Sequence, residues 1–388
     1  MLRVLSLFSG IGAFESALTR RGYDFRVVNY CEIDPYASKA YSQIHGISED
    51  FNLHDVRQVN TLLMDNVNLM TWGWPCQDIS IAGKQRGFTD SDGNRTRSGL
   101  FFEGLRILET LQPEYAIAEN VKALTGKKFT AEFETVLTSL DKAGYNNYWK
   151  VLNAKDYGIP QNRERVFIIS IRKDIDTGTF TFPEKQELKL RVKDLLEPVV
   201  DEKYYLKSQK ADDLIRQILA KTDTNLQETD IKVNNIGTYN NHQSGIVNDP
   251  NGLSRCLTAV DYKDPVKIMA SEPKIKIVGR MDGYERTGRV YSSNGIACNL
   301  LARENSMQIL EEPAPKGGQR EVLETTQEAY RIRKLTPREC FRLMGFTDND
   351  FDKIKGISNT QLYKMAGNSI VVNVLEGIFR ELFKAQSR

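Results

Sequence analysis

The chain has 388 residues, of which 40% are hydrophobic and 27% are charged, and its formal net charge is +2. This length exceeds one ordinary hydrophobic core, so we expect two domains with a globular composition. No apolar run approaches the ~18 residues of a membrane-spanning helix. The first apolar run meets a glycine turn, which predicts a strand and not a signal peptide. A near-neutral charge neither requires nor excludes a nucleic-acid partner.

The cysteines predict a reducing cytoplasm. They are odd in number and scattered, with no C-x-x-C pair: Cys31, Cys76, Cys256, Cys298 and Cys340. This pattern argues against a disulfide framework and against a structural zinc site, so we expect no metal.

Apolar runs and amphipathic stretches alternate along the first half of the chain. The expected strands are Val4–Phe8, Arg26–Tyr30, Asn68–Trp72, Tyr115–Ala118 and Val166–Ile171. The expected helices are Phe14–Arg21, Ala37–His45, Leu100–Thr110 and Ala131–Ala143. Such alternation predicts an α/β fold with a Rossmann-like, doubly wound and mostly parallel sheet, which binds ligands at the carboxyl ends of its strands.

Residues 191–335 are polar and carry only short strand signals, which predicts a second, smaller β-rich domain. Two segments, 244–259 and 287–302, match without gaps at an offset of 43 residues, with 6 of 16 positions identical. Each contains Asn-Gly between apolar runs, a hairpin signal. Duplication of one hairpin and chance similarity of turn residues explain the match equally well.

The helical pattern returns after this region. Thr336 as N-cap, Pro337 at the first position and Glu339 two residues later predict a capped helix. The sequence 367–370 (Gly-Asn-Ser-Ile) then predicts a turn, followed by an amphipathic helix over Val371–Phe383.

A glycine loop, Phe8-Ser9-Gly10-Ile11-Gly12, joins the first strand to the first helix. Its glycines let a ligand approach the backbone. Glu32, at the end of the second strand, is placed to bind ribose hydroxyls. We expect Asp34 to cap the next helix and Asp55, at the end of a third strand, to take an exocyclic amine. No G-x-x-x-x-G-K-[ST] motif is present, so the expected cofactor is a nucleoside without a triphosphate.

Cys76 is the candidate nucleophile. Pro75 ends the preceding strand and holds the next side chain outside the ladder. A buried structural cysteine is the alternative interpretation. The stretch 77–98 has no apolar period, and loops of this length are typical of lids. Its basic residues could close over a polyanion: Lys84, Arg86, Arg95 and Arg97.

A candidate acid and two arginines follow. Glu119 comes after a buried-type run, so we expect desolvation to favour its protonated form, while Asn120 could cap a helix. Arg163 and Arg165 would project from one face of a strand and could fix a base oxygen or a phosphate. The alternative is a solvated edge strand whose arginines pair with Glu164.

Together these residues resemble the cytosine carbon-5 DNA methyltransferases of bacteria and phages. The matching motifs are Phe8–Gly12, Pro75–Gln77 with Ala82–Phe88, Glu119–Val121, Gln161–Arg165, Arg333–Cys340 and Gly367–Ser369. The chain departs from the family at Ser6, at Ala13 and at Asp78-Ile79, and none of these departures removes a reacting group.

The resemblance implies an enzyme that flips its target cytosine out of the duplex. Cys76 is then the nucleophile, Glu119 the acid at ring nitrogen 3, and Arg165 the anchor of the base oxygen with Arg163 in support. S-adenosylmethionine is the implied cofactor. Its implied contacts are Phe8, Ser9, Gly10, Ile11, Gly12, Glu32, Ile33, Asp55, Val56, Pro75, Leu100, Asn368, Ser369 and Ile370.

The implied partner is double-stranded DNA, bound by a monomer away from any membrane, and a cognate restriction endonuclease could act separately. Loop contacts are expected from Gln77, Ser80, Lys84, Gln85, Arg86, Gly87 and Arg97. His242, Gln243, Arg255 and Arg289 are candidate base readers, with simple solvation as the alternative. The expected units are a catalytic domain (1–190), a target-recognition domain (191–335), a hinge (336–362) and a C-terminal helix (363–388) that returns to the catalytic domain.

Two other functions compete with this one. An RNA cytosine-5 methyltransferase would share the chemistry, but the long variable region between Arg172 and Arg333 argues against a compact relative of that kind. A catalytically silent DNA-binding regulator would not need Cys76, Glu119 and Arg165 together.

Overall fold

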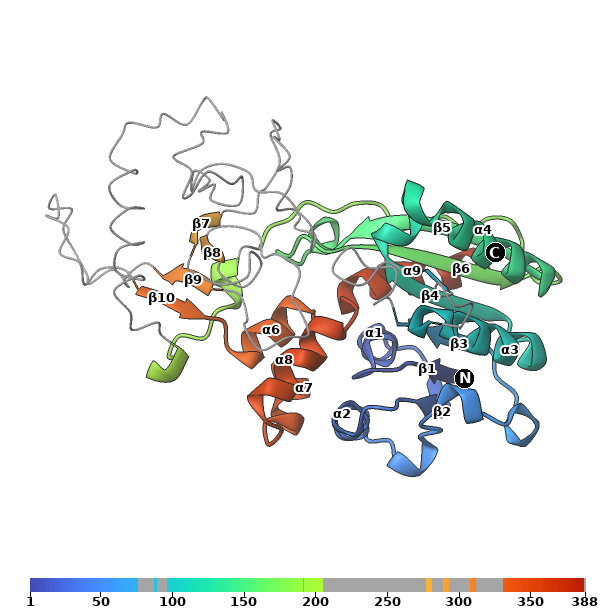
Figure 1. The fold of residues 1–388 in the computed structure, drawn as a ribbon, viewed down its shortest axis with the longest axis horizontal. Coiled ribbons are helices and arrows are strands. Elements are labelled where there is room, and N and C mark those ends of the chain that lie inside the picture. Colours follow the sequence, from blue (N-terminus) through green and yellow to red (C-terminus); the bar gives the residue numbers. More distant parts are fainter. Residues whose placement is uncertain are drawn as a thin grey trace, which may run out of the picture.

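A computed structural model describes residues 1–75, 87–88, 96–190, 192–204, 277–280, 289–292, 308–311 and 331–386. Its main feature is a six-stranded sheet in the order β2-β1-β3-β4-β6-β5 (Figure 1). The strands are β1 (Leu2–Leu7), β2 (Phe25–Cys31), β3 (Leu69–Trp72), β4 (Tyr115–Val121), β5 (Tyr145–Asn153) and β6 (Glu164–Arg172).

The strand directions confirm a mostly parallel sheet. β1 pairs in parallel with β2 and β3, and β3 pairs in parallel with β4. β6 is antiparallel to both β4 and β5, so it alone runs opposite to the other five strands of this sheet. The carboxyl ends of β1 to β4 therefore share one edge with the amino end of β6, and this edge carries the candidate site.

Both faces of the sheet are buried. Along β1, Val4 packs into one apolar cluster, while Leu5 and Leu7 pack into the other. Along β6, Phe167 and Ile168 alternate between the same two clusters. Successive side chains of a strand point to opposite faces, so near-continuous apolar strands need a helical layer on each side.

The helices form these two layers. Helices α3 and α4 contribute to one cluster, and α1, α2 and α9 to the other. α6 to α8 lie between the large sheet and a smaller sheet (Figure 1). The helices are α1 (Ala13–Arg20), α2 (Pro35–His45), α3 (Phe101–Leu111), α4 (Thr130–Lys142), α6 (Pro337–Leu343), α7 (Asp348–Ile354), α8 (Asn359–Asn368) and α9 (Val372–Gln386).

All nine elements expected in the first half of the chain are present, with ends shifted by a few residues. β5 was not expected. As an edge strand it exposes much of its surface, including 45% of Trp149, and so lacks the apolar pattern of a central strand. The expected third strand at Asp55 is wrong, because this residue caps a short 3-10 helix, Val56–Gln58.

The smaller sheet has the order β10-β9-β8-β7. Its strands are β7 (Ile277–Arg280), β8 (Arg289–Ser292), β9 (Gln308–Glu311) and β10 (Arg331–Lys334). β8 is antiparallel to β7 and parallel to β9. The first expected hairpin, 244–259, and most of the second lie outside the described residues.

The segment expected as a hinge, 336–362, contains α6, α7 and the start of α8. The predicted cap is confirmed: the Thr336 hydroxyl accepts from the backbone N–H of Glu339, and the Glu339 carboxylate accepts from that of Thr336. The predicted turn before the last helix is shorter than expected, because Gly367 and Asn368 still belong to α8.

Candidate active site

The chain entering the nucleophile position is fixed by two side chains. Asn120 donates from Nδ2 to the Trp74 carbonyl at 3.2 Å, and Ser98 donates from Oγ to the Pro75 carbonyl at 2.9 Å. Both donors are buried. Cys76 itself lies outside the described residues, so its place in the site stays a prediction. What the structure shows is that the two residues before it are anchored on both sides.

Aromatic packing reinforces this anchor. Trp74 is 2% exposed, and its ring lies 5.3 Å from Trp72 and 5.1 Å from Phe101, between centroids. Phe88 stacks on Phe101 with a centroid distance of 5.7 Å. A buried ring of this size makes many contacts and restricts the backbone that carries it.

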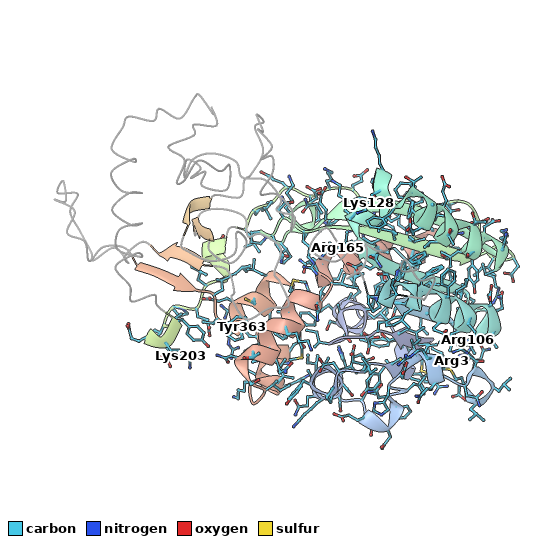
Figure 2. All side chains as sticks on the ribbon, in the orientation of Figure 1. Arg3, Arg106, Lys128, Arg165, Lys203 and Tyr363 are labelled. Carbon is cyan, nitrogen blue, oxygen red and sulfur yellow. The ribbon has the colours of Figure 1, made fainter. Side chains whose placement is uncertain are left out.

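Glu119 and Arg165 form a buried ion pair at this edge. The Arg165 Nε to Glu119 Oε1 distance is 3.0 Å, and the side chains are 15% and 12% exposed. Burial raises the pKa of Glu119, while Arg165 and then Arg163 oppose that rise. Figure 2 shows Arg165 at the end of the large sheet that faces the C-terminal helices.

The end of β3 passes beside this pair. A Cβ built on Gly73 would lie 3.5 Å from Oε2 of Glu119 and 3.8 Å from Cδ1 of Ile370. Gly73 is three residues before Cys76. Glu119, Arg165 and the segment that leads to Cys76 therefore converge at this edge of the sheet.

Arg163 differs from the expectation of two side-by-side arginines. It precedes β6, is 4% exposed, and donates from Nη2 to the carbonyls of Gly367 at 3.1 Å and Ser369 at 2.7 Å. Its charge still contributes to the electrostatics of Glu119. It therefore links the C-terminal segment to the acid.

The alternative of an edge strand with arginines paired to Glu164 is wrong. β6 lies between β4 and β5, and the Glu164 carboxylate pairs with Lys122 at 2.9 Å. Asn120 is not a helix cap either, since its amide holds the Trp74 carbonyl and its own Oδ1 accepts from the next backbone N–H.

The glycine loop has the backbone that its sequence requires. Phe8, Gly10 and Gly12 have φ values of 54°, 55° and 78°. A Cβ on Gly12 would lie 2.1 Å from Nε2 of His45, so no larger residue fits there. The loop is thus held tightly against α2.

Glu32 joins this loop to the start of α2. Its Oε2 accepts from the Gly10 N–H and its Oε1 from the Asp34 N–H, both at 2.8 Å. Burial raises the pKa of Glu32. The next residue, Ile33, is 68% exposed and presents apolar surface beside the carboxyl group. Asp34 caps α2 as predicted and also pairs with Lys364 of α8.

Asp55 forms an ion pair with Arg57, two residues later in the chain. Arg57 binds both of its carboxylate oxygens, and this hydrogen bonding lowers the pKa of Asp55. Val56 is buried, and its carbonyl accepts from Arg106. Leu100 ends a 3-10 helix, Arg97–Leu100, that leads into α3.

The C-terminal turn completes the edge. Asn368 is exposed at the end of α8, Ser369 is 7% exposed, and Ile370 approaches Gly73.

Among the predicted DNA contacts, Gly87 has φ 73°, and a Cβ there would lie 2.2 Å from Oε1 of Glu132. The remaining predicted DNA contacts fall outside the described residues: Gln77, Ser80, Lys84, Gln85, Arg86, His242, Gln243 and Arg255. Arg97 and Arg289 are described in their backbones only.

Sequence reasoning missed three residues of this site. Ser98 and Gln161 are fully buried, and Gln161 donates to the Leu343 carbonyl at 2.8 Å. Trp74 is the third. Ser98 and Gln161 bind backbone carbonyls, and Trp74 packs against aromatic rings. Nothing in a sequence marks which carbonyl or ring a side chain will reach.

Within the described ranges, no three His, Cys, Asp or Glu side chains gather as they would around a metal ion. No helix in that part of the chain is both long and apolar enough to cross a membrane.

Comparison with known proteins identifies the family. The model of the C-5 cytosine-specific DNA methylases matches residues 2–384. The orphan methyltransferase M.SPRI of Bacillus phage SPR is 34% identical over 98% of this chain and 97% of its own length. The type II methyltransferase M.HhaI of Haemophilus parahaemolyticus is 32% identical over 97% and 93%.

A solved structure agrees in fold. The methyltransferase EhMeth of Entamoeba histolytica superposes with a TM-score of 0.63 at 18% identity, covering 99% of this chain and 98% of that one. The match of the whole chain, together with the buried acid and arginine at the expected edge, leaves one assignment. The chain belongs to the C-5 cytosine-specific DNA methylase family and is a DNA (cytosine-5)-methyltransferase.

Proposed function

We propose that the protein methylates carbon 5 of a cytosine that it flips out of double-stranded DNA, within a restriction-modification or phage self-protection setting. The observation that carries this proposal is the Glu119–Arg165 pair, buried at 3.0 Å beside the anchored end of β3. A stacked base cannot offer its ring edge to such a site, so the target must leave the duplex.

The steps follow from the residues. The Cys76 thiolate adds to carbon 6 of the cytosine, which makes carbon 5 nucleophilic. Glu119, whose pKa burial raises, gives a proton to ring nitrogen 3 and accepts from the exocyclic amine. Arg165 holds the base oxygen. Carbon 5 takes the methyl group, a base removes its proton, and the electron pair returns to expel Cys76.

S-adenosylmethionine, the methyl donor of this family, supplies an electrophilic methyl group when it is bound. The residues present fit it. Each Glu32 oxygen has a second lone pair, so this carboxyl group can accept ribose hydroxyls without releasing Gly10 or Asp34. Ile33 offers an exposed apolar surface for a flat base. Ile370 approaches Gly73 and, with Ser369 before it, would border the cofactor.

The proposed organisation follows the expectation from sequence. The polar middle region would read the DNA sequence as a target-recognition domain, and the loop after Pro75 would close on the flipped base. Two aligned hairpins in that region would allow more than one target sequence.

Tritiated methyl transfer from S-adenosylmethionine tests the proposal. We expect label on duplex DNA, its loss in Cys76→Ala, and a severe reduction in Glu119→Gln. Cys340→Ala is the control, because Cys340 is buried in α6 and has no part in the chemistry. Label on tRNA alone would identify an RNA methyltransferase, and DNA binding without any transfer would identify a silent regulator.

A further inference from the structure

Glu15 is a buried acid that the proposed chemistry does not use. It lies in the first turn of α1, three residues after Gly12, and is 0% exposed. No hydrogen bond of good geometry reaches either carboxylate oxygen among the described residues, although the Tyr41 hydroxyl lies close enough to interact with it, and no ion pair is formed there. Burying a carboxyl group without a donor is costly unless a cation or a proton compensates it. The described residues therefore provide no cation that compensates this carboxyl group.

The surroundings of Glu15 place such a cation at the glycine loop. The Tyr41 hydroxyl is buried beside this carboxyl group, and burial followed by the charge of Glu15 raises the pKa of Tyr41. His45 also interacts with Glu15, and its Nε2 lies 3.0 Å from the Ile11 carbonyl. The hydroxyl of Ser9, in the loop itself, is buried and unpartnered within the described chain.

These groups form one polar layer directly behind the loop. Gly12 lies between these groups and the outer side of the glycine loop, since a Cβ on Gly12 would lie 2.1 Å from His45 and 2.9 Å from Tyr41. The layer contains a carboxyl group, two hydroxyls and an imidazole. Burial lowers the pKa of His45, which favours its neutral form. Within the part of the chain that the structure describes, no cation forms an ion pair with Glu15.

We infer that Glu15 is a positioning carboxylate that makes the glycine loop prefer a positively charged sulfonium cofactor over the neutral thioether left after methyl transfer. The inference rests on the proposed function. The two ligands differ by one methyl group and one unit of positive charge. A charge held in a desolvated site acts over several ångströms, so it can discriminate between them without touching either.

This preference would help turnover. Transfer of the methyl group removes the positive charge, and the attraction to Glu15 is lost at that moment. The product then keeps only the contacts that do not depend on the sulfonium charge, such as the proposed one from Glu32 to its ribose, and exchanges for new cofactor.

Calorimetric titration of the purified full chain with S-adenosylmethionine and with S-adenosylhomocysteine tests the inference. In Glu15→Gln we expect the Kd of the sulfonium ligand to rise about tenfold and that of the thioether by less than about twofold. Tyr41→Phe is the matched control, because it removes a polar atom of the same layer without changing charge. It should shift both values by the same factor.

Thermal unfolding without ligand gives an independent readout. Because this carboxyl group is buried without a cation among the described residues, its replacement by an amide should leave the Tm of Glu15→Gln equal to or above that of the wild type. If this variant does not fold, Glu15→Asp, which withdraws the charge from the loop, must change the ratio of the two Kd values in the same direction.

Equal weakening of both ligands in a folded variant, or no change in either, would overturn the inference. The wild-type protein provides the separate check on the proposed function. If it binds neither ligand, the cofactor assignment is wrong and the role of Glu15 falls with it.

Discussion

Replacement of Asn120 by alanine should damage the site by releasing the chain that leads to Cys76. The Asn120 amide is 2% exposed and donates to the Trp74 carbonyl at 3.2 Å, while its Oδ1 accepts from the Val121 N–H at 2.8 Å. Asn120→Ala removes both partners at once. The groups left behind are a carbonyl and an amide with no replacement of suitable length nearby.

The magnitude follows from those two groups. A buried polar group left without its partner costs about 1–3 kcal/mol. Two such groups, partly relieved by relaxation, should lower the free energy of unfolding by about 2–4 kcal/mol. Methyl transfer should fall further than stability alone explains, because a displacement of about 1 Å at a reacting atom can reduce the rate about 100-fold.

Urea unfolding and single-turnover methyl transfer measure the two effects. Asn146→Ala is the control: its amide donates to Asp176 at an exposed position, so stability should change by less than about 0.5 kcal/mol and the rate should not change. If Asn120→Ala unfolds at lower urea yet transfers methyl at the wild-type rate, the anchor at Trp74 does not position the nucleophile and the reasoning is refuted.

Three further outcomes are expected. Burial raises the pKa of Glu119 above its ordinary value of about 4.5, so the folded protein keeps this proton to a higher pH than the unfolded chain does. The free energy of unfolding should therefore fall as pH rises from about 4.5 through the pKa of the folded state. In Glu119→Gln this decline should be smaller, and chemical denaturation at several pH values measures it. Gly12→Ala should lower stability and weaken cofactor binding, since φ is 78° and the new methyl group overlaps His45. Gly22→Ala, which has a similar φ in open space, is the control for backbone strain alone. Equal losses in both variants would contradict the role of His45. Cys31 should resist alkylation at pH 8 in the native protein, because burial raises its pKa to about 12, and mass spectrometry that finds it labelled without denaturant would contradict this.

The sequence predicts elements well where both faces of a strand are buried. β1, β3 and β4 are apolar runs of this kind, and they were placed within a few residues. β5 was missed because an edge strand needs little apolar surface, and residues such as Trp149 remain partly exposed. Asp55 was misplaced because the segment after Asn52 forms 3-10 turns, which leave no periodic pattern.

The candidate site was predictable in its ionisable groups and unpredictable in its supports. Glu119 follows an apolar run, Arg165 precedes one, and the two side chains lie together at one edge of the sheet. The partners of Arg163 are backbone carbonyls at Gly367 and Ser369, about 200 residues away in the chain. Tertiary packing alone decides such contacts, and no local pattern encodes them.

The packing of α9 against α1 has a consequence for how the protein is made. Arg20 of α1 pairs with Glu376 of α9 at 2.9 Å and donates to the Gly345 carbonyl. One of the first helices to leave the ribosome therefore reaches its native contacts only after one of the last has been synthesised. Until then one apolar face of the sheet is only partly covered, by α1 and α2, and is a target for chaperones. The same packing favours a circular permutant in which a linker joins α9 to β1 and the new ends lie in the polar middle region.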